Sequence, residues 1–568
     1  MLSNVSIPEI LQPVAPILSQ YLQPLLLWLS QLVYQRLLAR QPHHPLVCLA
    51  GLLDFEALEL ACADYQAAPG RRGHPVVHQV RRLLRAMLVK YWYDLSLRQL
   101  EERLRCDMLF RWFVGYGLYE ETPDHTTLHR FEVYLYRAHP RLFFDTVLSQ
   151  IDASVEDGHD RVQLGDTFAL RANAALESLI QRLRHGAYNL LVSLQEADPD
   201  LYAALQPQLD EAALFGFKQE KRDFLLSREE WYARLLLTVQ AVSACLALLA
   251  AEATCPAALT QPMAHLHKIL ADELAISRDE SGRPLAVTLL SKKKRGQMRI
   301  CSATDPEASI RNHGPGKQDF GYNISLAATL DFVREIRADT GSTSDVTPIP
   351  ALLTAQAEHH DCLPAKLIYD QVAGTGKTAH EVAEASEGHT LLVVKPMPPK
   401  EKKTFGPERF IRSADGHALT CPDGRLITRH YRSGSGDGWI FRALAPQCRG
   451  CPLLLPCRGS DRPPTTKRDI FISDYRSDYD QLVAYSQTAD FKLDMKLRPQ
   501  VERIVAGLVL HNGARRARFR GLEKVDFQVK MAAMAYNAKH WLVLLAEREG
   551  RRKRPVRRHW GLPAPSQA

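Results

Sequence analysis

A short apolar run at residues 162–169 carries a single carboxylate, Asp166, and this feature constrains the fold more than any other. The apolar residues around it predict a buried β-strand. A carboxylate in a buried strand costs several kcal/mol unless it is paired or binds a cation. We therefore interpret Asp166 as the first of three metal-binding carboxylates. The alternative interpretation is an acid in a solvated turn at the end of a strand.

Two later acids fit the same role. An apolar strand ends at Asp370, and Glu502 lies in the first turn of a helix expected after Pro499. Carboxylates suit Mg²⁺ because it binds hard oxygen ligands and keeps exchangeable waters. Taken singly, each acid also fits an ordinary role, as a strand-end turn residue or as the negative charge that a helix N-terminus favours.

The order of the expected elements indicates an α/β fold. Strands are expected at residues 162–169, 320–327, 332–337, 367–370 and 390–394. A helix at 347–359 precedes the fourth strand, and a long helical segment at about 174–276 separates the first strand from the second. This is the order of a ribonuclease-H-like fold, in which an acid on the first strand and one at the end of the fourth lie side by side.

Length and composition describe a soluble protein of several domains. The 568 residues exceed one ordinary hydrophobic core, and 46% are hydrophobic and 24% charged. Residues 1–10 contain no Lys or Arg, which argues against a secretory signal. The longest apolar stretch, residues 235–251, is interrupted by Thr238, Gln240 and Ser243. It predicts a buried helix rather than a membrane span.

Short helices are expected between residues 75 and 139. Ser96 and Gln99 have the spacing of a capping box, and a further helix begins near Asp124. Tight turns between short helices in a basic context are typical of a helix-turn-helix-like DNA-binding unit. A plain helical bundle fits the pattern equally well. If the unit binds DNA, the contacts we expect are Arg98, Thr127 and Arg130.

Basic residues are concentrated near the C-terminus of a chain whose net charge is +8. A loop carries four arginines, Arg515, Arg516, Arg518 and Arg520. Six further positive charges lie within residues 551–558. Clustered arginines predict contacts to DNA phosphates rather than to bases. For the tail, a solvated end is the alternative.

Four of the eleven cysteines fall within residues 421–457: Cys421, Cys448, Cys451 and Cys457. A C-x-x-C pair with two further thiols nearby can supply a tetrahedral zinc site in a reducing cytoplasm. The alternative is four reduced cysteines without a metal.

Ordered motifs run from about residue 75 to residue 541. They are residues 97–103, 111–115 and 123–128, then 165–167, 304–306 and 321–323, then the four cysteines, and finally 501–502, 520–525 and 535–537. With these motifs the chain resembles bacterial insertion-sequence transposases of the DDE type. The resemblance implies a ribonuclease-H-like mixed sheet with a helical N-terminal DNA-binding domain, a long helical insertion and a small Cys-rich β insertion.

The resemblance also assigns roles. Asp166, Asp370 and Glu502 would hold Mg²⁺ or Mn²⁺, and the reaction would be two-metal cleavage and joining of DNA at the terminal inverted repeats of the element. The residues around Asp370 differ from the family pattern, so Asp361, in the preceding loop, is the alternative second acid. A domesticated DNA-binding protein without catalysis and a metal-dependent nuclease without strand transfer are the alternative functions.

The expected domains follow from these assignments: a helical N-terminal domain at 1–150, a catalytic domain at 160–396 and 491–548 with a helical insertion at about 174–300, a Cys-rich insertion at 400–490 and a basic tail at 549–568. The expected partner is double-stranded DNA, both transposon ends and target, with no membrane. We expect a homodimer or larger assembly, cytoplasmic and associated with the nucleoid.

Overall fold

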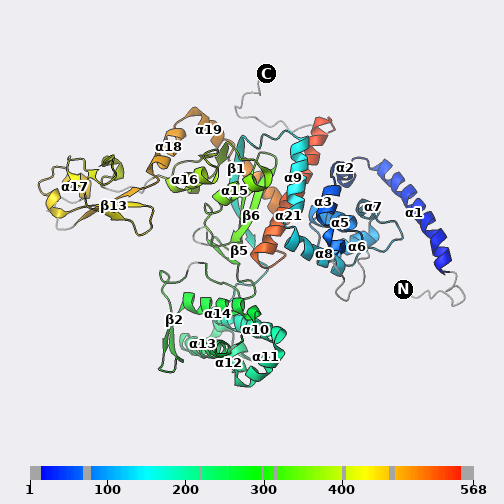
Figure 1. Cartoon of the computed structure of the whole chain (residues 1–568), viewed down its shortest axis with the longest axis horizontal. Helices are drawn as coiled ribbons and strands as arrows, with labels where there is room; N and C mark the ends of the chain where they lie inside the picture. Colours follow the sequence, from blue (N-terminus) through cyan, green and yellow to red (C-terminus); the bar gives the residue numbers. More distant parts are fainter. Residues whose placement is uncertain are drawn as a thin grey trace.

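The computed structural model describes residues 15–67, 78–217, 219–252, 254–296, 298–312, 314, 316–398, 404–459 and 467–551. A central mixed sheet is flanked by helices, and three further parts surround it (Figure 1). Helices of the N-terminal region lie on one side, a helical insertion lies below, and a lobe of short strands lies at the far end.

The central sheet has the expected strand order. Its strands are β1 (Val162–Arg171), β4 (Ser309–Asn312), β5 (Gln318–Ala328), β6 (Val333–Thr340), β7 (Lys366–Ile368) and β8 (Leu391–Val393). β1 pairs antiparallel with β5 and parallel with β7, β6 pairs with β5, and β8 pairs with β7. The first and fourth expected strands, β1 and β7, are therefore neighbours, and the ribonuclease-H-like α/β core is confirmed. The short strand β4, which the sequence did not predict, pairs with the start of β5.

Helices cover both faces of the sheet because successive side chains of its strands point to opposite sides. On one face, Leu164 and Ile368 pack in a core shared with α9 (Leu142–Ser154), α20 (Gln500–His511) and α21 (Leu522–Arg548). On the other face, Leu367 and Leu392 pack in a separate core. That core is built by α15 (Ile349–His360), α16 (Gly376–Ala385) and α18 (Arg476–Ser486).

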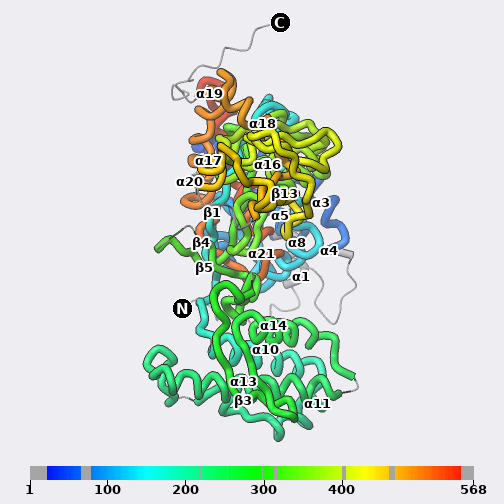
Figure 2. Tube along the Cα trace, turned by 90° about the vertical axis from the view of Figure 1, so that its left-hand side faces the viewer, coloured from blue at the N-terminus to red at the C-terminus, as the bar shows by residue number. Residues whose placement is uncertain are grey.

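The helical insertion between β1 and β4 has its own core, and Figure 2 shows it below the rest of the chain. Its helices are α10 (Leu179–Ala197), α11 (Pro199–Leu205), α12 (Glu211–Phe215), α13 (Arg228–Ala251) and α14 (Thr260–Glu273). The helical segment expected to reach residue 276 ends earlier, at an unpredicted hairpin of β2 (Leu274–Arg278) and β3 (Pro284–Leu289). Among the described residues, α13 alone has the length and apolarity of a membrane span, and one of its faces is buried in this core.

Within the described residues, one long helix and seven shorter ones precede α9 and the sheet. They are α1 (Ala15–Arg40), α2 (Pro45–Leu52), α3 (Glu56–Ala61), α4 (Asp64–Ala67), α5 (Val80–Trp92), α6 (Leu97–Cys106), α7 (Met108–Val114) and α8 (His125–Ala138). The predicted capping box of Ser96 and Gln99 begins α6, and Asp124 caps α8 by accepting the Thr127 N–H. A fully buried ion pair of 2.5 Å, Lys90 with Glu132, joins α5 to α8.

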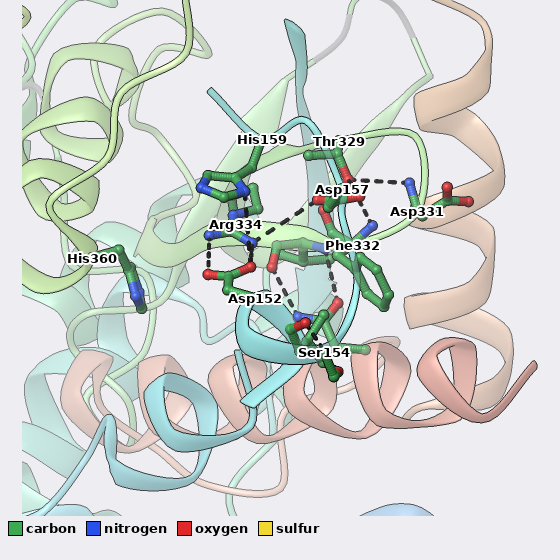
Figure 3. Close-up of polar contacts among 12 residues, drawn as sticks. Asp152, Ser154, Asp157, His159, Thr329, Asp331, Phe332, Arg334 and His360 are labelled. Atoms are coloured by element: carbon green, nitrogen blue, oxygen red, sulfur yellow. Dashed lines mark hydrogen bonds and ion pairs between the residues drawn. The ribbon is translucent and has the colours of Figure 1, made fainter. Parts of the chain in front are cut away.

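A second buried charge cluster ties α9 to the start of β6 (Figure 3). Arg334 is 1% exposed and donates two hydrogen bonds, of 2.6 and 2.8 Å, to Asp152. Asp157 lies on the other side of this guanidinium at 4.0 Å and accepts a 3.0 Å bond from Thr329 Oγ1. Burial raises the pKa of Asp157 to about 7, although the bond from Thr329 and the charge of Arg334 act in the opposite direction.

The lobe at the far end consists of short strands: β9 (Ile411–Arg412), β10 (Leu419–Thr420), β11 (Leu426–Ile427), β12 (His430–Arg432), β13 (Gly438–Ala443) and β14 (Arg468–Ser473). They form two three-stranded sheets around a small core that includes Phe410 and Phe441. The chain then returns to the central sheet through α18 and α19 (Ala489–Met495). Lys366 on β7 bonds to Asp494 on α19 at 2.9 Å.

Candidate active site and nucleic-acid contacts

The strand register brings Asp166 and Asp370 to the same level of the sheet. The last paired residues of β1 and β7 are Leu164 and Ile368. Each acid lies two positions beyond its residue of that pair (166 − 164 and 370 − 368). Neighbouring strands lie about 4.8 Å apart, and residues two positions apart share a face. The two carboxylates therefore belong to one face of the sheet, the face that α20 and α21 cover.

The close approach of β1 and β7 at this level depends on Gly165. The ring of Tyr369 lies across it, and a Cβ at Gly165 would meet two of the ring carbons at 2.3 Å. Tyr369 is buried and bonds through its hydroxyl to the Asp345 backbone oxygen at 3.2 Å. A side chain at position 165 would push the ring away, and with it the strand end that holds Asp370.

Glu502 reaches the same site from α20. This helix packs against β1, buries Val501, Ile504 and Leu508, and leaves the Glu502 side chain 69% exposed. The third acid is thus at the border between a buried stripe and solvent. Such a position allows a carboxylate to face both the sheet and a ligand that arrives from outside.

The electrostatics of Asp166 show that the three acids influence one another. Burial raises its pKa, the nearby charges of Glu502 and Asp370 raise it further, and the guanidinium of Arg498 opposes them. One oxygen, Oδ1, accepts the Thr167 N–H at 2.8 Å. The ionised form of Asp166 is therefore destabilised by its surroundings, and an additional positive charge nearby would stabilise it.

Arg498 supplies the positive charge in this structure. Its Nη2 lies 3.2 Å from Asp166 Oδ1, and its Nη1 lies 3.7 Å from Glu502 Oε1. Its Nε is buried without a hydrogen-bond partner in the described part of the chain. The sequence placed Arg498 beside the third acid but gave no sign of this role. A search for an arginine one helical turn before a suspected metal-binding acid would have found it.

The three acids could supply ligands to a divalent metal, because their carboxylates offer hard oxygen donors on one face of the fold. In their present arrangement, no group of three or more His, Cys, Asp or Glu side chains among the described residues has the geometry of a metal site. The Arg498 guanidinium lies between Asp166 and Glu502. Binding of a metal by all three acids therefore requires this arginine to move aside.

A buried polar network supports β1 directly behind Asp166. Arg311 on β4 donates to Thr167 Oγ1 at 2.7 Å and to Asp345 Oδ1 at 3.0 Å. Asn323 on β5 bonds to the same Asp345 oxygen at 3.0 Å. Arg311 and Asp345 lie in no recognisable motif, so no sequence signal points to them.

Three motifs that are far apart in the sequence meet at the start of α21. The hydroxyl of Tyr322 donates to the Asp305 carboxylate at 2.7 Å, and the Gly521 N–H is 3.0 Å from that hydroxyl and 3.2 Å from Asp305 Oδ1. The Leu522 N–H donates to Glu307 at 2.6 Å. These bonds satisfy orphan N–H groups at the helix N-terminus and fix α21 against β5.

The arginines of the basic loop, residues 515–520, differ in exposure and in the bonds that they make. Arg515 and Arg516 are exposed, and Arg520 is exposed while its Nε bonds to the Asn173 carbonyl at 3.1 Å. Arg518 is engaged: it pairs with Asp94 and donates to the Leu95 carbonyl at 2.7 Å. The loop therefore both joins the catalytic sheet to the α5–α6 connection and presents positive charge to solvent.

The N-terminal candidates lie on two helices. Arg98, on the first turn of α6, and Arg130, on α8, are exposed, and Thr127 is half-buried. On the inner face of α8, Leu128, Phe131 and Leu135 are buried.

The four cysteines line one small cavity of about 30 Å³, although they come from three segments. Cys421 follows β10 and accepts the Arg425 N–H at 3.3 Å, and Cys457 lies 2.8 Å from Arg468 Nη1. All four are free thiols, and burial raises the pKa of Cys451. A shared cavity with a backbone N–H donated to sulfur fits a thiolate site in donor chemistry.

Two further predicted residues or segments lie elsewhere. Asp361 ends α15 in a left-handed conformation (φ 47°), before β7, whereas Asp370 follows β7. Asp361 therefore lies at the end of β7 opposite to Asp370, away from the level of Asp166. Of the basic tail, residues 552–558 lie outside the described residues.

Comparisons with known families match two segments of this chain. Residues 35–133, from α1 to α8, match a transposase domain family (DUF772), and residues 420–542 match a transposase DDE domain family. The second match includes the cysteines, Glu502 and most of α21; Asp166 and Asp370 precede it. No curated protein and no solved structure matches the chain. Together with the ribonuclease-H-like core, these two matches support a DDE-type insertion-sequence transposase.

Proposed function

We propose that this transposase cleaves and joins DNA at the terminal inverted repeats of its own insertion sequence, with Asp166, Asp370 and Glu502 as the catalytic acids. One observation carries the proposal: the parallel pairing of β1 and β7 puts Asp166 and Asp370 at one level on the face against which α20 presents Glu502. Members of this family use a divalent metal, and Mg²⁺ or Mn²⁺ would be held by these three carboxylates. When bound, the metal would activate a water or a DNA 3′-hydroxyl and stabilise the leaving oxygen at phosphorus.

The residues of the chain contribute position and charge. Burial keeps Asp166 in a site of low dielectric, where its attraction to a cation is strong. Gly165 and Tyr369 set the separation of the two strand ends. Arg311 fixes the side chain of Thr167, the residue after Asp166 on β1. Arg498, displaced from the acids, would be available to a DNA phosphate, for which a planar guanidinium is well suited.

DNA would contact the chain at two basic regions. Arg98, Thr127 and Arg130 on α6 and α8 would bind the transposon end, and Arg515, Arg516 and Arg520 would hold phosphates beside the sheet. The tail at 551–558 would add a contact that is independent of sequence. A protein that acts on DNA in this way works in the cytoplasm, on the nucleoid, and it would act as a homodimer or larger assembly to join two ends.

The four cysteines would hold one structural Zn²⁺ in the lobe between Asp370 and Glu502. Their common cavity supports this proposal, because all four thiols line it and thiolates are ligands of structural zinc. Bound zinc would make the lobe rigid where its own hydrophobic core is small.

A second candidate function is DNA binding without cleavage, as in a domesticated transposase. The observation that favours it is the position of Arg498, which neutralises Asp166 and Glu502 without any metal. The cleavage experiment described next distinguishes DNA binding without cleavage from transposition.

The test uses purified protein, Mg²⁺ and a duplex that contains the repeat found beside the gene. Asp166→Asn, Asp370→Asn and Glu502→Gln each remove a charge and preserve shape, so each should abolish cleavage and leave DNA binding intact. Asp361→Asn is the matched control, since Asn tolerates the left-handed conformation at that position. Normal cleavage by Asp370→Asn together with loss in Asp361→Asn would identify Asp361 as the second acid. Normal cleavage by all three amides would exclude the catalytic proposal, and absence of cleavage by the wild type would favour the second candidate.

A further inference from the structure

Helix α1 turns Ser30 and Tyr34 inward and most of its described leucines outward. It docks on the segment after α7 through Ser30 and Tyr34, which lie one turn apart and are buried. Ser30 Oγ accepts the Leu118 N–H at 3.0 Å, and the Tyr34 hydroxyl donates to the Tyr116 carbonyl at 2.8 Å. A surface helix normally buries its apolar side, so this reversed orientation leaves an apolar face without a partner in the described chain.

The exposed face is a continuous stripe. Six large apolar side chains, each between 37% and 54% exposed, form it: Leu22, Leu25, Trp28, Leu29, Leu32 and Val33. Four of the leucines follow the 3-4-3 spacing of the a and d positions of a heptad. In Figure 1, α1 lies at the edge of the N-terminal helices, on the side away from the sheet.

We propose that this stripe pairs with the α1 stripe of a second copy of the chain, so that α1 is the dimerisation helix of the transposase. Residues 15–35 contain no Asp, Glu, Lys, Arg or His, so the stripe has no charge with which to select an acidic or basic partner. A second copy offers the same uncharged apolar surface around a two-fold axis. The heptad spacing provides the register in which the leucines of two such helices interlock.

The available area is sufficient for a modest interface. From the exposed fractions, the six side chains would bury roughly 500 Å² per copy, or roughly 1,000 Å² in total, which is the lower limit for a specific interface. A bilayer is a poorer occupant, because α1, although 26 residues long, is less apolar than a membrane span requires, whereas α13 is apolar enough. The transposase domain match begins at residue 35, so the stripe precedes the part of the chain that resembles that family.

The pairing does not depend on the proposed catalysis, although the proposed function supplies a reason for it: two ends must be held together before they are joined. The test is sedimentation velocity of the full chain over a concentration series, without DNA. We expect the wild type to shift from monomer to dimer. Leu29→Glu, at the centre of the stripe, should raise the dimer dissociation constant by more than about 100-fold, because each copy would bring a charge to the interface.

Gln31→Glu is the matched control, since it adds the same charge to the same helix at an exposed position outside the stripe. It should leave the dissociation constant within about threefold of the wild type, as an exposed charge away from the interface has little effect. A wild type that stays monomeric at every concentration, a dimer that survives Leu29→Glu, or equal effects of the two variants would overturn the proposal. Binding to uncharged lipid vesicles that Leu29→Glu abolishes, in a chain that is otherwise monomeric, would assign the stripe to a membrane instead.

Failure of this proposal is distinguishable from failure of the proposed function. A monomeric wild type that still nicks a single repeat, and loses nicking in Asp166→Asn, would overturn the α1 pairing alone. A dimer that Leu29→Glu separates, but that never cuts DNA, would leave the pairing intact and remove the catalytic proposal.

Discussion

Arg498 forms an ion pair with Asp166 in which both side chains are nearly buried, at 14% and 13% exposed. The pair connects the approach to α20 with the centre of β1. Its location means that the guanidinium and a divalent metal would compete for the same carboxylates. A single guanidinium thus offsets part of the negative charge of the acids in this structure.

Replacing Arg498 should make the fold depend on metal. Arg498→Gln leaves a buried carboxylate without its counter-charge, so the free energy of unfolding should fall by roughly 3 kcal/mol in chelator. Mg²⁺ should recover most of this loss and should stabilise the variant more than it stabilises the wild type. Thermal unfolding with and without Mg²⁺ measures both effects. The control is Arg503→Gln, an exposed arginine of α20; equal Mg²⁺ responses of the two variants would contradict the competition.

The two exposed arginines of the basic loop should set part of the salt dependence of DNA binding. Arg515→Gln with Arg516→Gln should weaken binding to all duplexes alike and reduce the slope of log K against log salt by about 2, one phosphate contact for each arginine. Arg518→Gln removes the same charge from the same loop, but its partners are Asp94 and Leu95. It should lower thermal stability and leave the slope unchanged. A change in sequence preference with an unchanged slope in the double variant would show base contacts instead.

The Cys-rich lobe should contain one zinc ion for each chain. Metal analysis of protein purified under reducing conditions should give a stoichiometric amount, and Cys451→Ser should lose it and unfold the lobe at a lower temperature. Cys255→Ser, an exposed cysteine in the helical insertion, is the control and should retain the metal. If the wild type holds substoichiometric zinc and Cys451→Ser has no effect, the prediction is wrong and the four cysteines are reduced thiols without a metal.

The sheet was predictable because hydrophobic runs and turn residues are local signals. The order of β1, β5, β6, β7 and β8 follows from them, and the neighbourhood of Asp166 and Asp370 follows from that order. Both helix caps at Ser96 and Asp124 were readable for the same reason, since a cap joins two residues only three positions apart.

The elements that escaped prediction depend on contacts between distant segments. The hairpin of β2 and β3 follows a strongly helical stretch, and its strands are mostly exposed and short, so their apolar pattern is weak. Asn537 appeared only as a motif residue, yet its side chain accepts the Val333 N–H at 2.8 Å and donates to the Val333 carbonyl at 2.9 Å. A residue in the last helix thus satisfies the edge of β6, a role that no local pattern reveals. Arg498 was hidden in the same way, because its partner is 332 positions away (498 − 166).

Stability should depend on pH through Asp157. Its pKa is raised to about 7 in the folded chain, mainly by burial, from an ordinary value near 3.8. A raised pKa means that the folded state holds this proton more tightly than the unfolded state does. The stabilisation is therefore complete below about pH 4 and is lost as the pH rises to about 7. The total loss in the free energy of unfolding is at most roughly 4 kcal/mol.

Asp157→Asn keeps the side chain neutral at every pH and so isolates this effect. The variant should gain stability relative to the wild type between pH 4 and pH 8, with most of the change complete by about pH 7. Urea unfolding at several pH values measures the difference, and Asp160→Asn, at an exposed position, accounts for the loss of one negative charge. Because Arg334 also pairs with Asp152, the cluster in Figure 3 should remain assembled in the variant. A constant difference between Asp157→Asn and the wild type over this range would mean that Asp157 is ionised in the folded protein throughout, with Arg334 outweighing its burial.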